Sequence, residues 1–167
     1  MDFEVNQWAV HPRHGVGRIA KIEAKCFNAG PERQYYRLEI PTGTVWVPVE
    51  GSTCGLRQLF AKKDLATYRN LLRSRPAPLD PDYRQRQITL AARQRESSFE
   101  ARCKLVRDLT AFAWKKSLNE ITSVMLQRAS AALCAEWAAV MGLPIEKAKF
   151  EVQSLLLEGR QAFDQAG

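Results

Sequence analysis

The chain has few of the residues on which metal sites, disulfide frameworks and most catalytic centres depend. Its 167 residues include only two histidines and four cysteines. The cysteines (Cys26, Cys54, Cys103 and Cys134) are scattered without a Cys-x-x-Cys pair, whereas zinc sites and disulfide frameworks need closely spaced or patterned cysteines. We therefore expect four reduced thiols, no metal and no cofactor.

Motifs of the common enzyme classes are also missing. The sequence has no P-loop, no Gly-x-Ser-x-Gly, no paired metal-binding carboxylates and no Cys/His constellation. His11 and His14 have a spacing seen in metal sites, but no acidic residue or cysteine is positioned beside them, so we expect them to pack in a turn. These absences disfavour a hydrolase or nuclease, and the missing ATPase motor excludes a translocase. The sequence predicts a protein that is not an enzyme.

Long apolar runs are missing as well. No stretch approaches the roughly 18 apolar residues that a membrane-spanning helix requires. The first residues, Met1 to Val5, have neither the basic region nor the apolar region of a signal peptide. We expect a cytoplasmic protein without membrane contact, long enough to bury a hydrophobic core.

The positive charge of the chain is concentrated in one segment. The net charge is +7, and residues 61–107 hold twelve Lys and Arg against five acidic residues. The segments 1–60 and 108–167 are each close to neutral. Such a segment suits a polyanionic partner. The alternative is a solvated face that only keeps the protein soluble.

The first 60 residues show the period-two alternation of β-strands. Their β-branched and aromatic residues predict strands at 7–11, 17–24, 34–40 and 45–49 and a short one at 56–59. Nearly every connection contains glycine or proline, which favours a small, strongly bent antiparallel sheet or half-open barrel. Gly15 and Gly17 fit positions where the chain turns sharply or takes positive φ.

After residue 60 the apolar residues follow a helical period. Helices are expected at 62–74, 82–95, 97–116, 121–141 and from Pro144 to Phe163, with the proline-rich segment 75–81 stopping the first. Ser117 and Asn119 are both candidate caps for the fourth helix. Short loops between these helices favour a compact bundle. The sequence thus predicts an α+β protein with domains 1–60 and 61–167.

Two blocks of sequence resemble one known family. The first contains Trp8-Ala-Val-His-Pro-Arg-His-Gly-Val-Gly-Arg-Ile-Ala-Lys-Ile-Glu23, then Tyr35-Tyr-Arg-Leu-Glu-Ile40 and Thr44-Val-Trp-Val-Pro-Val49. The second contains Leu105-Val-Arg-Asp-Leu109, Leu118-Asn, Met125-Leu, Ala129, Leu133 and Glu136. In order and spacing they resemble the CarD/CdnL family of bacterial transcription regulators, whose N-terminal module also occurs in transcription-repair coupling factors.

The resemblance implies a Tudor-like module that binds the RNA polymerase β subunit, followed by a helical DNA-binding domain that stabilises the open promoter complex. Family members hold a wedge tryptophan at the upstream edge of the bubble. Counting back from Arg107-Asp-Leu109, that position falls on Tyr83. Tyrosine can still stack on an exposed base or enter a widened minor groove, with less surface than indole.

Basic residues accompany Tyr83, and they suit phosphate contacts around an inserted ring. These candidates are Arg84, Arg86, Arg93 and Arg95. Nothing in the sequence offers a base-reading helix, so the expected target is promoter DNA recognised without sequence specificity.

The candidate polymerase-binding residues are Arg18, Lys25 and Trp46. Arg18 and Lys25 match the basic polymerase-contacting face of the family, although an ordinary solvated edge would look the same. Trp46 departs from relatives, which often carry a polar or basic residue there. It alternates with Val45 and Val47, so it is either a core residue or an exposed anchor for a partner. An edge strand added to a sheet of the polymerase would supply backbone hydrogen bonds.

Two functions follow from these observations. The first is a transcription regulator associated with the nucleoid through RNA polymerase. The alternative is a polymerase-binding adaptor that recruits another protein with little direct DNA contact, and the tyrosine at the wedge position motivates it.

Overall fold

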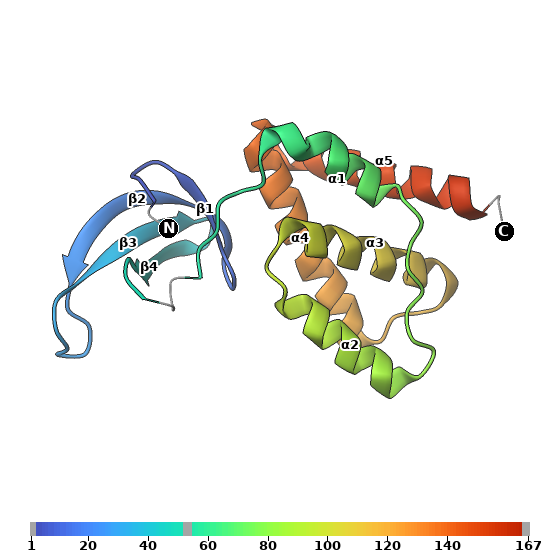
Figure 1. The fold of residues 1–167 in the computed structure, drawn as a ribbon, viewed down its shortest axis with the longest axis horizontal. Coiled ribbons are helices and arrows are strands. Elements are labelled where there is room, and N and C mark those ends of the chain that lie inside the picture. The colour runs from blue at the N-terminus through green and yellow to red at the C-terminus, as the bar shows by residue number, and fades with distance from the viewer. Residues whose placement is uncertain (1–2, 52–54, 165–167) are drawn as a thin grey trace. The chain divides into compact units, whose positions relative to one another are not determined.

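A computed structural model describes residues 3–51 and 55–164 of the chain. The chain divides into two compact units, Met1–Leu59 and Phe60–Gly167. Within the described residues a four-stranded antiparallel sheet comes first and five α-helices follow (Figure 1). The predicted α+β class is confirmed.

The N-terminal unit is a meander of four strands. They are β1 (Trp8–His11), β2 (Gly15–Lys25), β3 (Arg33–Ile40) and β4 (Gly43–Pro48), paired in sequence order. The strand predicted at 56–59 is wrong. Of this segment only Arg57 pairs with β1, in an isolated bridge. The Val10 amide donates to the Arg57 carbonyl over 2.8 Å, and the Arg57 amide donates to the Val10 carbonyl over 3.1 Å. The chain then leaves the sheet and enters the helical unit, whose first residue, Phe60, donates its amide to the Glu136 carboxylate over 3.0 Å.

Two glycines allow the tight path of β2. Gly15 has a φ of 77°, a left-handed conformation that costs glycine little. At Gly17 a Cβ atom would lie 2.8 Å from the carbonyl oxygen of Glu39, so no side chain fits there. The pairing with β3 then shifts register between Ile19 and Lys21, an irregularity that bends a strand. Figure 1 shows β2 and β3 as curved arrows, in line with the bent sheet that the sequence predicts.

One face of the sheet carries the core of this unit. Its buried members are Phe3, Ala9, Ile19, Tyr36 and Leu38. The Tyr36 hydroxyl accepts a hydrogen bond from the Phe3 amide over 3.1 Å, so its polar end is satisfied inside the core. The opposite face carries charged side chains together with Tyr35 and Trp46.

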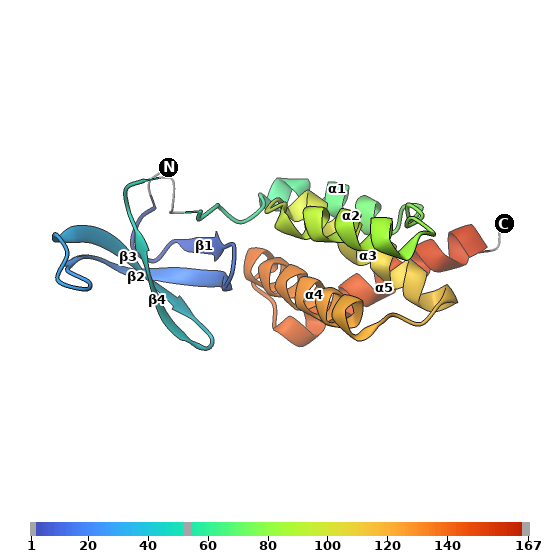
Figure 2. The same ribbon diagram turned by 90° about the horizontal axis from the view of Figure 1, so that it is seen from below.

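The C-terminal unit is a bundle in which α3 is the central helix. A short 3₁₀ turn, η1 (Lys62–Asp64), leads into α1 (Leu65–Leu72), α2 (Tyr83–Arg95), α3 (Phe99–Lys115), α4 (Glu120–Met141) and α5 (Ile145–Asp164). Helix α3 packs against each of the other four. In Figure 2, α4 lies on the opposite side of α3 from α1.

Caps define the helix ends. Asn119, and not Ser117, caps α4 by accepting from the Thr122 amide over 2.8 Å. Gly142, with a φ of 65°, ends the same helix where the sequence predicted its end.

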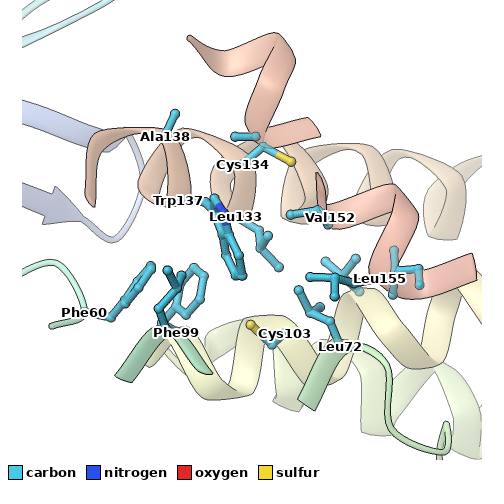
Figure 3. Packing of buried hydrophobic residues seen from close by; sticks show 14 residues of the cluster. Phe60, Leu72, Phe99, Cys103, Leu133, Cys134, Trp137, Ala138, Val152 and Leu155 are labelled. Atoms are coloured by element: carbon cyan, nitrogen blue, oxygen red, sulfur yellow. The ribbon is translucent and has the colours of Figure 1, made fainter. Parts of the chain in front are cut away.

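Aliphatic side chains, aromatic rings and two buried thiols form the main core of the bundle (Figure 3). The rings of Phe60 and Phe99 stack with centroids 4.3 Å apart, and Trp137 projects from α4 beside them. Cys103 and Cys134 are free, buried thiols, and burial raises the pKa of both. Cys26 is likewise free but exposed, whereas Cys54 lies outside the described residues.

A second, smaller core anchors α2. Its members are Leu90 of α2, Leu105 and Leu109 of α3, and Met125 of α4. Because Leu90 is the only fully buried residue of α2, most of this helix faces solvent. No helix in the described part of the chain is long and apolar enough to span a membrane.

Candidate functional site

The face of the sheet opposite its core gathers the three residues predicted to bind polymerase. Paired residues of an antiparallel sheet share a face, and alternate residues of a strand point to the same side. Arg18 of β2 pairs with Glu39 of β3. Two residues before Glu39 on β3, Arg37 pairs with Trp46 of β4. The register therefore places Arg18, Lys25 and Trp46 on this outer face.

Trp46 is a surface residue held in a defined orientation. Its indole Nε1 donates to Glu23 Oε1 over 2.8 Å, and the Lys25 ammonium lies 4.1 Å from its ring centroid. The Phe27 ring stands 6.2 Å away, centroid to centroid. The side chain is half-buried among these neighbours. Trp46 is therefore not a core residue of the sheet, and its role as an anchor for a partner stays a prediction.

Glu23 organises the outer face, and sequence reasoning did not single it out. Besides Trp46, its carboxylate lies 3.6 Å from Lys21 Nζ and 3.8 Å from Lys25 Nζ. The hydrogen bond from Trp46, followed by the neighbouring cations, lowers the pKa of Glu23 below its usual value. The side chain thus stays ionised at neutral pH and fixes both indole and ammonium. Its period-two spacing from Lys21 and Lys25 was the signal for a shared face.

Strand β4 offers an open edge beside this face. The Val49 amide donates to the Gln34 carbonyl over 3.0 Å. Since hydrogen-bonded pairs alternate along an antiparallel ladder, the backbone groups of Thr44 and Trp46 point away from β3. Pro48 has no N–H, as suits an edge. No other strand of the described chain pairs with this side of β4. Two outward-facing residues can therefore exchange backbone hydrogen bonds with a partner strand.

The histidines serve the β1–β2 turn. His11 Nδ1 accepts from the amides of Arg13 and His14 over 3.0 and 3.2 Å, in line with the predicted turn packing. Burial, then the nearby charges of His14 and Arg13, lowers the pKa of His11. Among the residues that the structure describes, no group of three or more potential ligands could hold a metal ion.

Tyr83 begins α2 and is both exposed and held. Asp82 caps the helix by accepting from the Arg84 amide over 2.8 Å. The Tyr83 side chain is 55% exposed, and its hydroxyl accepts from Asn119 Nδ2 over 3.0 Å. Because Asn119 Oδ1 is used in capping α4, the amide is oriented with its nitrogen towards Tyr83. An exposed ring with a fixed hydroxyl is suited to stacking on a flat partner.

The Arg86 guanidinium contacts the Tyr83 ring. It lies 5.6 Å from the Tyr83 centroid and 5.0 Å from the Phe112 centroid. It also donates to the carbonyl oxygens of Asp80 and Pro81 over 2.9 and 3.2 Å. Through these contacts Arg86 links the proline-rich segment to Tyr83 and limits the movement of the ring.

The other three predicted arginines lie on the same helix in two settings. Arg84 and Arg95 are exposed on the solvent side of α2 together with Ile88, which is 59% exposed. Within the described chain, neither guanidinium makes an ion pair or hydrogen bond. Arg93 instead donates to Asp108 Oδ2 over 2.8 Å.

Asp108 is the buried centre of the network that holds α2. Its carboxylate is 2% exposed and accepts from Arg93, from Arg107 Nε over 2.9 Å and from the Ala77 amide over 2.9 Å. Arg107 also donates to Ser74 Oγ over 2.8 Å. One carboxylate thus ties the proline-rich segment and α2 to α3. The sequence marked Arg107-Asp-Leu109 as part of the family pattern but did not indicate this role.

Comparison with known proteins bears on the N-terminal unit. Residues 3–58 match the family model of the CarD-like/TRCF RID domain. The match spans the whole sheet and ends just before the helical unit. No curated protein matches the chain.

Proposed function

Residues 3–58 belong to the CarD-like RNA polymerase-interacting domain family, and from this membership we propose that the chain is a transcription regulator that holds RNA polymerase and promoter DNA together. The N-terminal unit binds the β subunit of the polymerase. The helical unit binds promoter DNA at the upstream edge of the bubble and stabilises the open complex. The protein needs no catalytic residue for this and acts at the nucleoid in the cytoplasm.

The polymerase contact uses the outer face and open edge of the sheet. Trp46 carries this part of the proposal, because its ring lies on that face and its backbone on the edge of β4. A partner strand added there gains backbone hydrogen bonds from β4, while Lys25 and Arg18 select for acidic side chains. Oriented aromatic residues are frequent energetic centres of interfaces.

The DNA contact uses the exposed side of α2. Tyr83 stacks on an unpaired or splayed base at the edge of the bubble, and Arg84 and Arg95 contact phosphates. Arg86 and Arg93 support the contact indirectly, since the first braces Tyr83 and the second fixes α2 on Asp108. Readout of this kind recognises melted DNA without regard to sequence.

The regulatory effect is one of linkage. A protein that binds the open complex more tightly than the closed one shifts their equilibrium by the ratio of its two affinities. Attachment to polymerase raises the effective concentration of the helical unit near the promoter, so a weak stacking contact becomes sufficient. The Tyr83 contact exists only where bases are unstacked, which provides the difference between the two states.

Binding to polymerase tests the first step. Core polymerase and isolated β subunit, each immobilised on a sensor, are titrated with the full chain and with the double variant Lys25→Ala/Trp46→Ala. We expect binding of the wild type and at least about a tenfold loss for the variant, as for hot-spot residues. The matched control, Lys62→Ala/Lys63→Ala, removes two exposed cations of the helical unit and should bind as the wild type. Equal binding by all three proteins would show that the outer face does not contact polymerase.

The adaptor remains the second candidate. Exposed apolar side chains on the helical unit favour it, among them Ile121 at 68% and Phe150 at 74% exposure. An adaptor would bind polymerase equally well but show no affinity for forked promoter DNA. Forked DNA binding that weakens with salt therefore separates the two functions.

A further inference from the structure

The helical unit has a groove with an apolar floor and basic residues around it, which the proposed polymerase and promoter contacts do not use. The groove holds about 380 Å³ and lies between the proline-rich segment, the C-terminal end of α3 and the last turns of α5. Its apolar lining includes Pro76, Pro78, Leu79 and Phe112. The Ala77 amide in this segment is fixed to Asp108 over 2.9 Å, so the groove is formed before any ligand binds.

Basic residues surround this apolar lining. They are Arg75, Lys115, Lys116 and Arg160. Among the described residues of the lining, only Asp108 is acidic, and its carboxylate is already occupied by Arg93, Arg107 and a backbone amide. The groove therefore presents positive charge around an apolar floor.

Two of the cations lie over aromatic walls of the groove. The Arg160 guanidinium is 4.8 Å from the Trp114 centroid, and that of Arg75 is 6.0 Å from the Phe163 centroid. Placed in this way, the Arg75 guanidinium keeps its N–H groups around its edge, where they suit the two oxygens of a carboxylate. The rings also limit the movement of both arginines.

We propose that this groove binds a short acidic peptide of a partner protein, with an aromatic or leucine side chain between carboxylates. The apolar residue fills the floor of prolines, Leu79 and Phe112, and the flanking carboxylates meet Arg75, Lys115 and Lys116. A nucleic acid fits less well. Its backbone has no apolar group for the floor, and its bases would have to displace Arg160 and Arg75 from the rings on which they could stack. None of the residues proposed to touch polymerase or DNA lines the groove, although Asp108 and Phe112 of its lining also contact Arg93 and Arg86.

The test is a titration of the full chain, labelled with ¹⁵N, followed by NMR. The probe is a mixture of capped decapeptides with Phe, Leu or Trp at the centre and Asp or Glu at most other positions. The first control mixture has serine at the centre, and the second probe is a thymidine dodecamer. We expect the acidic–apolar mixture to shift the Trp114 indole signal at or below about 1 mM peptide.

Variants locate the site. The pair Lys115→Glu/Lys116→Glu reverses two exposed cations of the groove, and we expect about tenfold weaker peptide binding. The matched pair Lys62→Glu/Lys63→Glu makes the same charge change outside the groove and should leave binding within about twofold of the wild type. Circular dichroism of both variants checks that the bundle is folded.

Three results would overturn the proposal. Equal binding of the serine-centred mixture would show that the apolar floor is unused. Tighter binding of the dodecamer at the Trp114 signal would make the groove a nucleic-acid site. No shift of that signal by any peptide at about 1 mM would show that the groove takes no such ligand.

Discussion

The buried carboxylate of Asp108 on α3 accepts a hydrogen bond from the guanidinium of Arg93 on α2 over 2.8 Å. The same carboxylate accepts from Arg107 and from the Ala77 amide. Helix α2 has only Leu90 fully buried, so this polar contact supplies much of what fixes its position. The exposed residues proposed to meet DNA depend on that position.

Removal of this carboxylate should destabilise the bundle. Asp108→Ala leaves the half-buried Arg93 and the buried Arg107 without their acceptor, and we expect a loss of about 3–5 kcal/mol in the free energy of unfolding. Urea denaturation followed by circular dichroism measures it. The control Glu100→Gln breaks an exposed pair with Lys104 and should cost less than about 0.5 kcal/mol. Similar losses for the two variants would contradict the network.

Arg84 and Arg95 should contribute to the salt dependence of DNA binding. Each contact with a phosphate contributes about one unit to the slope of log K against log salt. We expect Arg84→Ala and Arg95→Ala each to lower the slope by about that amount, equally for unrelated DNA sequences. Fluorescence anisotropy with forked DNA at several salt concentrations measures the slope. Lys147→Ala, an exposed change on α5, should leave it unchanged; a drop as large as that of Arg84→Ala would point to diffuse charge effects.

Local patterns predicted the elements but not the long-range contacts. The period-two and helical patterns located four strands and five helices within a few residues in the described chain. The predicted strand at 56–59 failed because a four-residue segment, Leu-Arg-Gln-Leu, cannot indicate whether a neighbouring strand is available. Trp46 stayed ambiguous because alternation fixes two faces without saying which one is buried.

Local sequence patterns could not predict the partners of Asp108 and Glu23, the two carboxylates that organise the helical unit and the sheet. Asp108 meets Ala77 and Arg93, which lie 31 and 15 residues away along the chain. Glu23 meets Trp46 across 23 residues. Such partners become visible only when register and packing are known, so Arg93 was predicted as a DNA contact and its anchoring role was missed.

Glu23 should control the orientation of Trp46. Glu23→Ala removes the acceptor of the indole N–H and the partner of Lys25, so we expect a shift in Trp46 fluorescence and several-fold weaker polymerase binding. Glu23→Gln keeps an acceptor and should have the smaller effect. The lowered pKa of Glu23 implies that the wild-type spectrum stays constant as pH falls to about the usual carboxyl range and changes only below it. Glu39→Ala, on the same face, is the control; an equal effect on Trp46 fluorescence would contradict the assignment.

The β1–β2 turn should weaken in mild acid. The pKa of His11 is lowered in the folded chain from 6.5, first by burial and then by the charges of His14 and Arg13, and its neutral Nδ1 accepts two backbone amides. A lowered folded pKa means that its contribution to stability is complete above the unfolded value and is lost as pH falls through the folded one. We expect the N-terminal unit to lose stability as pH falls below about 6.5.

Replacement of His11 isolates this effect. In His11→Ala the pH dependence of the urea midpoint should flatten. His14→Asn keeps the backbone amide that donates to His11, so this variant should retain more of the pH dependence. An unchanged dependence in His11→Ala would assign the titration to another group.

The lifetime of the open promoter complex tests the central claim most directly. The wild type is compared with Tyr83→Ala, Tyr83→Phe and Lys25→Ala/Trp46→Ala, using the host polymerase and a single promoter. Tyr83 is 55% exposed, so its replacement should leave the fold intact. We predict that the wild type lengthens the lifetime and that Tyr83→Phe retains most of the effect. Tyr83→Ala should lose it by a factor corresponding to about 1–3 kcal/mol of base stacking, and the double variant should lose it through failure to bind polymerase. A Tyr83→Ala lifetime equal to that of the wild type would contradict the account and favour an adaptor that does not touch DNA.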